Sequence, residues 1–217
     1  NVAISKANFN SFNVTPTASK FITFNSSNNG LAADDVGGNL QLISTTTASD
    51  DSTISITSGI DTTYKEYVIK MINVHPGTDN VDFRMNLSAD GGSNYNVSKT
   101  SHFFRASHQE DDGAASLDNA TSPDLANSTG VQAISGLTIG GDNDQSCSGE
   151  IRLFDPSNTT FVKQYFVTTQ TYSANGDAST HCFVAGYGNT TSAVNAIQFT
   201  MSSGNIQSGT FKLYGIL

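Results

Sequence analysis

The sequence is poor in charge and in several residue types on which specific functions depend. Only 13% of its 217 residues are charged, about half of the usual ~25%, and tryptophan is absent. Ten basic residues against 19 acidic ones give a net charge of −9, so the chain lacks the basic stripe that nucleic-acid binding requires. The same balance disfavours attachment to anionic lipid. We therefore expect neither nucleic acid nor membrane as a partner.

Long apolar runs and a cysteine framework are also missing. No stretch of about 18 apolar residues occurs, so no membrane-spanning helix is predicted. The two cysteines, Cys147 and Cys182, are too few for a disulfide scaffold. Both lie in predicted strands, where they either face each other across a sheet or are buried as small apolar side chains.

What the chain does contain is characteristic of a folded β protein. Thirteen phenylalanines and seven tyrosines lie in regularly spaced apolar runs, which argues against disorder. Serine, threonine, asparagine and glycine take the place of charged residues and predict a neutral, polar surface. A chain of this length can bury a sizeable core as one all-β domain.

The clearest pattern lies at the C-terminal end. Residues 196–202 and 210–217 each alternate apolar and polar side chains, and a stretch rich in glycine and serine separates them. Period two predicts antiparallel strands with one buried face, joined here by a turn. Because the closing strand would belong to the core, we expect any anchoring arm at the N-terminal end.

Similar runs recur along the whole chain, separated by Gly, Pro, Asn and Asp turn signals. About a dozen short strands of this kind predict an all-β, antiparallel β-sandwich with a jelly-roll-like arrangement. The runs are 20–24, 39–46, 52–57, 64–74, 81–88, 94–106, 131–139, 149–154, 161–172, 181–187, 196–202 and 210–216.

Two segments depart from the strand pattern. Residues 1–18 contain Phe9 and Phe12 but no alternation, and predict a docking arm ahead of a single domain over residues 19–217. Residues 107–130 are acidic, with Glu110, Asp111 and Asp112 in sequence. They predict a long surface loop, with a helical turn near residues 114–117, that serves either recognition or packing between subunits.

Catalytic motifs are not apparent, and we expect no enzyme. There is no Gly-x-Ser-x-Gly elbow, and the four histidines lack zinc-ligand spacing. His75 precedes Pro76-Gly77 and is interpreted as structural. Glu66 and Glu150 each lie beside a strand, but whether two carboxylates face each other depends on the fold. The absence of tryptophan further weakens a polysaccharide-cleaving function.

Calcium is the one cofactor with a candidate site. Asp142 and Asp144 lie in the loop Gly140-Gly-Asp-Asn-Asp, whose carboxylates are ligands that hard cations prefer. No complete calcium-loop motif is present, and Asp and Asn also favour turns for backbone reasons. No other cofactor is expected.

Several sequence blocks together resemble surface structural proteins, of decoration or fibre type, from marine tailed bacteriophages. The blocks span most of the chain and are residues 58–67, 72–81, 91–95, 101–106, 147–157, 183–187 and 211–216. The resemblance implies a virion protein without catalytic residues. A neutral surface suits seawater, where salt screens charge over a few ångströms.

Three functions follow as hypotheses. The first is a structural module of the particle surface, a head decoration or short fibre, expected to be a homotrimer in contact with other virion proteins. An extensive flat interface would favour it. The second is a tail-fibre domain that binds a host glycan or outer-membrane protein, favoured by a polar groove lined by Tyr and Phe. The third is a secreted carbohydrate-binding or polysaccharide-cleaving domain, favoured by a cleft with two facing carboxylates.

Overall fold

The computed structural model describes residues 20–24, 31–35 and 39–217, and the chain forms two compact units that divide after Asn39. In the first unit, β1 (Lys20–Phe24) pairs antiparallel with β2 (Leu31–Asp35). The predicted docking residues Phe9 and Phe12 lie outside the described residues.

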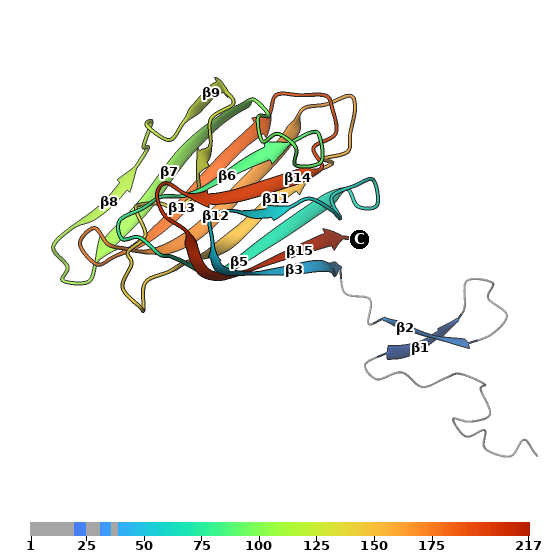
Figure 1. Cartoon of the computed structure of the whole chain (residues 1–217), viewed down its shortest axis with the longest axis horizontal. Coiled ribbons are helices and arrows are strands. Elements are labelled where there is room, and N and C mark those ends of the chain that lie inside the picture. The colour runs from blue at the N-terminus through green and yellow to red at the C-terminus, as the bar shows by residue number, and fades with distance from the viewer. Residues whose placement is uncertain (1–19, 25–30, 36–38) are drawn as a thin grey trace, which may run out of the picture. The chain divides into compact units, whose positions relative to one another are not determined.

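The second unit, Leu40–Leu217, is an antiparallel β-sandwich, which confirms the predicted fold class (Figure 1). Its larger sheet is antiparallel at every strand pair, and β9 (Leu125–Ser128) pairs with β7 beside the main path. The order along the sheet is β3 (Leu40–Asp51), β15 (Ile206–Ile216), β5 (Glu66–Pro76), β11 (Cys147–Phe154), β12 (Lys163–Ser173), β13 (Ala178–Gly188), β7 (Lys99–Gln109) and β8 (Ala115–Asp118).

The smaller sheet has four strands and covers one face of the larger one. Its order is β10 (Gln132–Ala133), β6 (Phe83–Ser88), β14 (Ala196–Met201) and β4 (Ile54–Ile56). The chain passes repeatedly from one sheet to the other, as in a jelly roll.

The core lies between the two sheets and is centred on phenylalanine. Phe199 of the small sheet lies 4.9 Å, ring to ring, from Phe211 of the large sheet, and Phe83 lies 6.2 Å from the same ring. All three side chains are fully buried. Such aromatic contacts join the inner faces of the two sheets.

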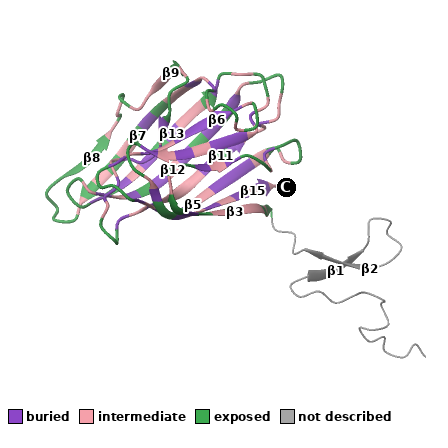
Figure 2. Ribbon diagram, viewed as in Figure 1, coloured by how far each residue is buried: buried purple, intermediate pink, exposed green. Residues whose placement is uncertain are grey.

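Alternation along the strands separates this core from an open outer face. On β12, residues 163, 165, 167, 169, 171 and 173 are buried, while the residues between them are exposed or half-buried. β13 follows the same rule. Figure 2 shows the resulting change between buried and exposed positions along these strands. At β12 and β13 the outer face of the large sheet is therefore open to solvent.

The C-terminal strands are the main correction to the expected connectivity. The two alternating runs do form β14 and β15, and β15 is in the core as predicted. However, β14 pairs with β4 and β6, whereas β15 pairs with β3 and β5. The glycine-rich break between β14 and β15 carries the chain from the small sheet to the large one. As a result, Phe199 and Phe211 face each other across the core.

The acidic segment after residue 107 is also more regular than expected. Residues 115–118 form β8, not a helical turn, because they pair with residues 105–108 of β7. β9, which lies in the same segment, also pairs with β7. The helical expectation was wrong because composition in a short polar stretch carries no information about a strand partner elsewhere in the chain.

Two lysines are buried inside the sandwich. The Lys99 ammonium donates to the Asn86 side-chain oxygen and, at 2.9 Å, to the carbonyl oxygen of Val97. Burial lowers the pKa of Lys99 to about 8. Lys163 donates to the carbonyl oxygen of Phe161 at 2.6 Å, and burial lowers its pKa too.

Both cysteines are buried free thiols. Cys147 lies opposite Thr171 and Cys182 lies opposite Thr169, so the two are not direct cross-strand neighbours. Burial raises the pKa of Cys147 to about 11 and that of Cys182 to about 12. Of the two alternatives for the cysteines, the structure therefore contains the second, in which both are buried as small apolar side chains.

Candidate functional site

The outer face of the large sheet carries an apolar slot with phenylalanine walls. Phe104 and Phe183 lie opposite one another on neighbouring strands, with ring centroids 4.8 Å apart and planes 14° from parallel. Phe166 lies on the next strand and meets Phe154 edge-on at 5.3 Å. The rings of Phe104, Phe166 and Phe183, together with the small side chain of Ala185, border a cavity of about 290 Å³. Such a slot can accept a bulky apolar group.

The phenylalanines are exposed although they are part of regular strands. Phe104 is 38% exposed, Phe166 54% and Phe183 39%. Each follows directly on an inward-facing apolar residue, so strand geometry turns it outward. These three phenylalanines were not expected from the sequence to be site residues. The available signal was an unbroken run of three apolar residues, as in Tyr165-Phe166-Val167, because at least one member of such a run must face solvent on a one-sided sheet.

An ion-pair network borders the slot. The Arg152 guanidinium donates through Nε to Glu150 at 3.0 Å and through Nη1 to Glu66 at 3.1 Å. Lys70 lies 3.9 Å from the second Glu150 oxygen. The hydrogen bond with Glu150 is the main cause of a raised pKa at Arg152.

Glu66 and Glu150 are thus close together, but on an open sheet and both bound to one arginine. A glycosidase instead places two carboxyl groups on either side of the glycosidic bond that it cleaves. This arrangement therefore favours an ion-pair role over acid–base chemistry.

A more polar groove adjoins the slot along the same strands. It has a volume of about 450 Å³ and includes His108, Glu110, Gln170, Tyr172 and Ser179. The pKa of Tyr172 is raised, first by desolvation and then by nearby carboxylates such as Glu110. Hydrogen-bonding groups around one aromatic ring are the kind of surface that a polar ligand such as a sugar requires.

The predicted acidic residues lie at the end of this groove. Glu110, Asp111 and Asp112 form the exposed turn between β7 and β8. Asp112 accepts from His108 at 3.0 Å, and the Asp111 side chain accepts from the Gly113 backbone at 2.8 Å. Of the three, Glu110 borders the groove.

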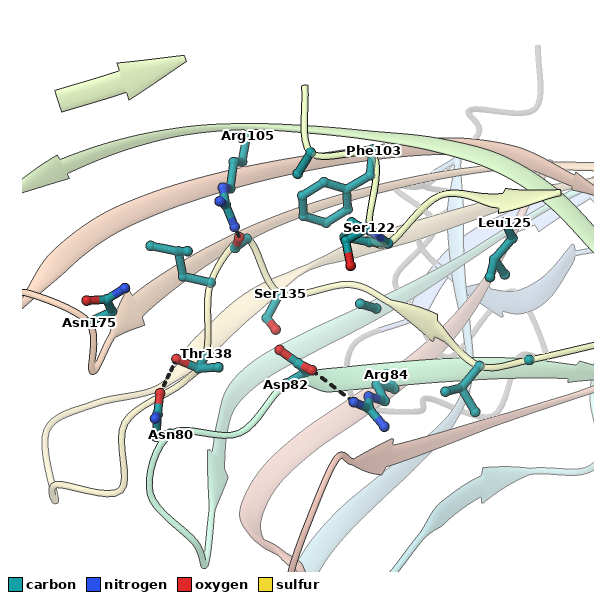
Figure 3. Close-up of a pocket in the computed structure, with 17 residues that line it drawn as sticks. Asn80, Asp82, Arg84, Phe103, Arg105, Ser122, Leu125, Ser135, Thr138 and Asn175 are labelled. Carbon is teal, nitrogen blue, oxygen red and sulfur yellow. Dashed lines mark hydrogen bonds and ion pairs between the residues drawn. The ribbon is translucent and has the colours of Figure 1, made fainter. Parts of the chain in front are cut away.

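A separate, larger depression lies beside the connection that follows the acidic segment. It has a volume of about 680 Å³ and contains two arginines (Figure 3). Arg84 is paired with Asp82 at 2.9 Å, and Arg105 with Asp118 at 3.0 Å. Each guanidinium is therefore already matched by a carboxylate of the same chain, so the depression has no unbalanced charge to hold an ionic ligand.

The calcium candidates Asp142 and Asp144 lie in an exposed loop. The Asp142 backbone donates to the Gln145 side chain at 3.2 Å, and its carbonyl oxygen accepts from the Gln145 backbone at 2.9 Å. In the part of the chain that the structure describes, no group of three or more His, Cys, Asp or Glu side chains is placed to hold a metal. Calcium binding at Asp142 and Asp144 stays a prediction.

His75 occupies a structural position, as its place before a turn indicated. Its Nδ1 lies 2.6 Å from the carbonyl oxygen of Gln145. This contact ties the end of β5 to the loop that precedes β11.

Comparison of the chain with protein-family models, with curated proteins and with solved structures gives no match. The structure contains no helix capable of spanning a membrane among its described residues.

Proposed function

We propose that this chain is a non-catalytic structural module on the surface of a tailed-bacteriophage particle. It acts as a head decoration or part of a short fibre, as a homotrimer in contact with other virion proteins. The resemblance of residues 58–67, 147–157 and 211–216 to such proteins supports the proposal. The observation that carries it is the broad outer face of the large sheet, which exposes Phe104, Phe166 and Phe183. Exposed apolar patches of this kind mark interaction surfaces.

A non-catalytic role agrees with the state of the reactive groups. Cys147 and Cys182 are buried thiols with raised pKa values, which keeps them protonated and poor nucleophiles. Glu66 and Glu150 are bound to Arg152. These groups are therefore assigned to structure.

The proposal is tested on purified particles of the phage that encodes the chain. Mass spectrometry should identify the chain in particles that remain after gradient purification and nuclease treatment. Amine-reactive biotin applied to intact particles should modify Lys65, whose side chain is 82% exposed, and not the buried Lys99. Absence of the chain from purified particles would refute the proposal.

A second function, recognition of a host-surface glycan, is favoured by the polar groove around Tyr172. Its donors and acceptors, His108, Gln170 and Glu110, are side chains of the type that bind sugar hydroxyls. Purified protein applied to a glycan array should then bind selectively, and Tyr172→Ala should abolish binding. A Leu217→Ala variant, changed at a distant exposed side chain, is the matched control. Lack of binding to any glycan would refute glycan recognition and leave an outer-membrane protein as the remaining receptor for this second function.

A further inference from the structure

Exposed apolar side chains are concentrated on one face of this protein. Eleven large apolar side chains are exposed among the described residues. Three of them, Val131, Phe161 and Leu217, lie outside the strands. The other eight project from the outer face of the large sheet and are Leu40, Leu42, Ile72, Phe104, Leu117, Phe166, Phe183 and Tyr187. We propose that this face is the contact surface between copies of the chain.

Strand registers show that the eight residues share a face. Leu42 lies opposite Tyr214, which lies opposite Val68, and Val68 lies opposite Arg152. Arg152 is opposite Phe166. Cross-strand partners point to the same side of a sheet, so this row runs over one face from the edge strand β3 to the centre of the sheet.

The amount of exposed apolar surface matches a protein partner. The eight side chains are 37% to 80% exposed. With large side chains presenting on the order of 150–200 Å² each when free, the face offers roughly 600 Å² of apolar area. A stable interface buries about 800 Å² of total surface per partner. Since a small ligand in the slot would cover only three phenylalanines, a protein surface is the better match.

The charges on the face favour another copy of the chain as the partner. The outward-facing charged residues of β5, β11 and β15 are Lys70, Lys212, Arg152, Glu66 and Glu150. Three cations and two anions give +1 on these strands, and Glu110 of the adjoining groove brings the sum to zero, whereas the whole chain carries −9. Two copies repel each other over most of their surfaces. The outer face is where they approach at least electrostatic cost.

The pattern of charge also suits self-association. Lys212 lies directly opposite Lys70, and Lys70 is already 3.9 Å from Glu150 of its own chain, so Lys212 is the cation on this face without an ion pair among the described residues. Glu66 and Glu150 lie on neighbouring strands of the same face. In a symmetric or cyclic arrangement, Lys212 of one copy can pair with a carboxylate on the face of the next. The Phe104–Phe183–Phe166 slot then receives an apolar side chain from the facing sheet.

Sedimentation velocity of the purified chain over a wide concentration range tests the proposal. Wild-type protein should form a discrete oligomer. A Phe166→Ser, Phe183→Ser variant should raise the dissociation constant at least about tenfold, because central aromatic side chains carry most of the energy of an interface. A Phe161→Ser, Val131→Ser variant is the control, since it removes two exposed apolar side chains away from the face.

Circular dichroism of each variant must show the wild-type β spectrum, so that loss of association is not loss of folding. A second variant pair, Lys212→Glu and Lys70→Glu, changes the charge of the face without touching the phenylalanines, and should weaken association in low salt. A wild-type chain that stays monomeric at every concentration overturns the proposal, as does association unaffected by the phenylalanine variant. Association that is unaffected by the phenylalanine variant would indicate that copies pair through the edge strand β3 or β8 instead. The outcome is independent of whether the chain is found in virions.

Discussion

Phe104 and Phe183 stack on the outside of the sheet with their rings 4.8 Å apart, although both belong to strands whose other faces are buried in the core. Their contact couples β7 to β13 without help from the sandwich interior. In a double-mutant cycle, Phe104→Ala and Phe183→Ala should show a coupling free energy of about 0.5–1.5 kcal/mol. Urea denaturation at low protein concentration measures it in the monomer. Strict additivity would mean that the two rings do not stabilise one another.

Replacement of Phe211 should be far more damaging, because its ring joins the two sheets. Phe211→Ala removes contacts with both Phe83 and Phe199, and should cost about 3–5 kcal/mol of unfolding free energy. Deletion of residues 211–217 should abolish folding, since β15 lies between β3 and β5. Leu217→Ala, at a side chain 74% exposed, should change stability little. A soluble truncated chain with a native β spectrum would contradict this role for β15.

Gly149 should not tolerate a side chain. A Cβ atom there would lie 2.2 Å from the Thr168 carbonyl oxygen and 2.7 Å from the Thr169 Cα, and backbone atoms of a central strand cannot move aside cheaply. Gly149→Ala should destabilise the protein by about 1–3 kcal/mol. Gly77→Ala is the matched control, because its nearest atom would be 3.7 Å away. Equal melting temperatures for the two variants would show that β11 and β12 are further apart than described.

The cysteines should be unreactive until the protein unfolds. Both thiols are buried and their pKa values are raised by burial, so little thiolate exists at pH 8. Ellman's reagent should label neither thiol in the native protein and both in denaturant. Rapid labelling of the native chain, or a mass change on reduction, would contradict two buried free thiols.

Burial of Lys99 makes the free energy of unfolding depend on pH. Its pKa is about 8 in the folded protein and near 10.5 when unfolded. Between these values the unfolded chain binds more protons, so stability contributed by this group rises with pH. Relative to Lys99→Met, the wild type should gain up to about 3 kcal/mol between pH 8 and 10.5. The comparison with Lys99→Met cancels the opposing effect of Cys147 and Cys182, whose raised pKa values reduce stability as pH rises. A pH-independent difference would mean that Lys99 is not buried.

Much of the sandwich could be predicted from local patterns. Period-two alternation located β5, β6, β11 and β14 closely, because one face of each lies in the core. It could not assign strands to sheets, so β14 and β15 were expected to be joined by a turn when they lie in opposite sheets. β8 and β9 were missed because both are exposed and polar, and only their pairing with β7 makes them strands.

The candidate site was harder to predict from the sequence than the fold. The acidic triplet at residues 110–112 was located correctly in a surface turn, but only Glu110 borders a groove. Phe104, Phe166 and Phe183 come from three strands, and nothing in their local sequence says that they share a face. That relationship depends on register, which long-range pairing determines.

We propose that the outer face of the large sheet is where this chain meets its neighbours on a phage particle. The decisive experiment is a cryo-EM reconstruction of the intact virion. We expect surface density for the sandwich, with the Phe104, Phe166 and Phe183 faces of neighbouring copies buried against one another. A particle without this chain, or one in which that face points to open solvent, would contradict it.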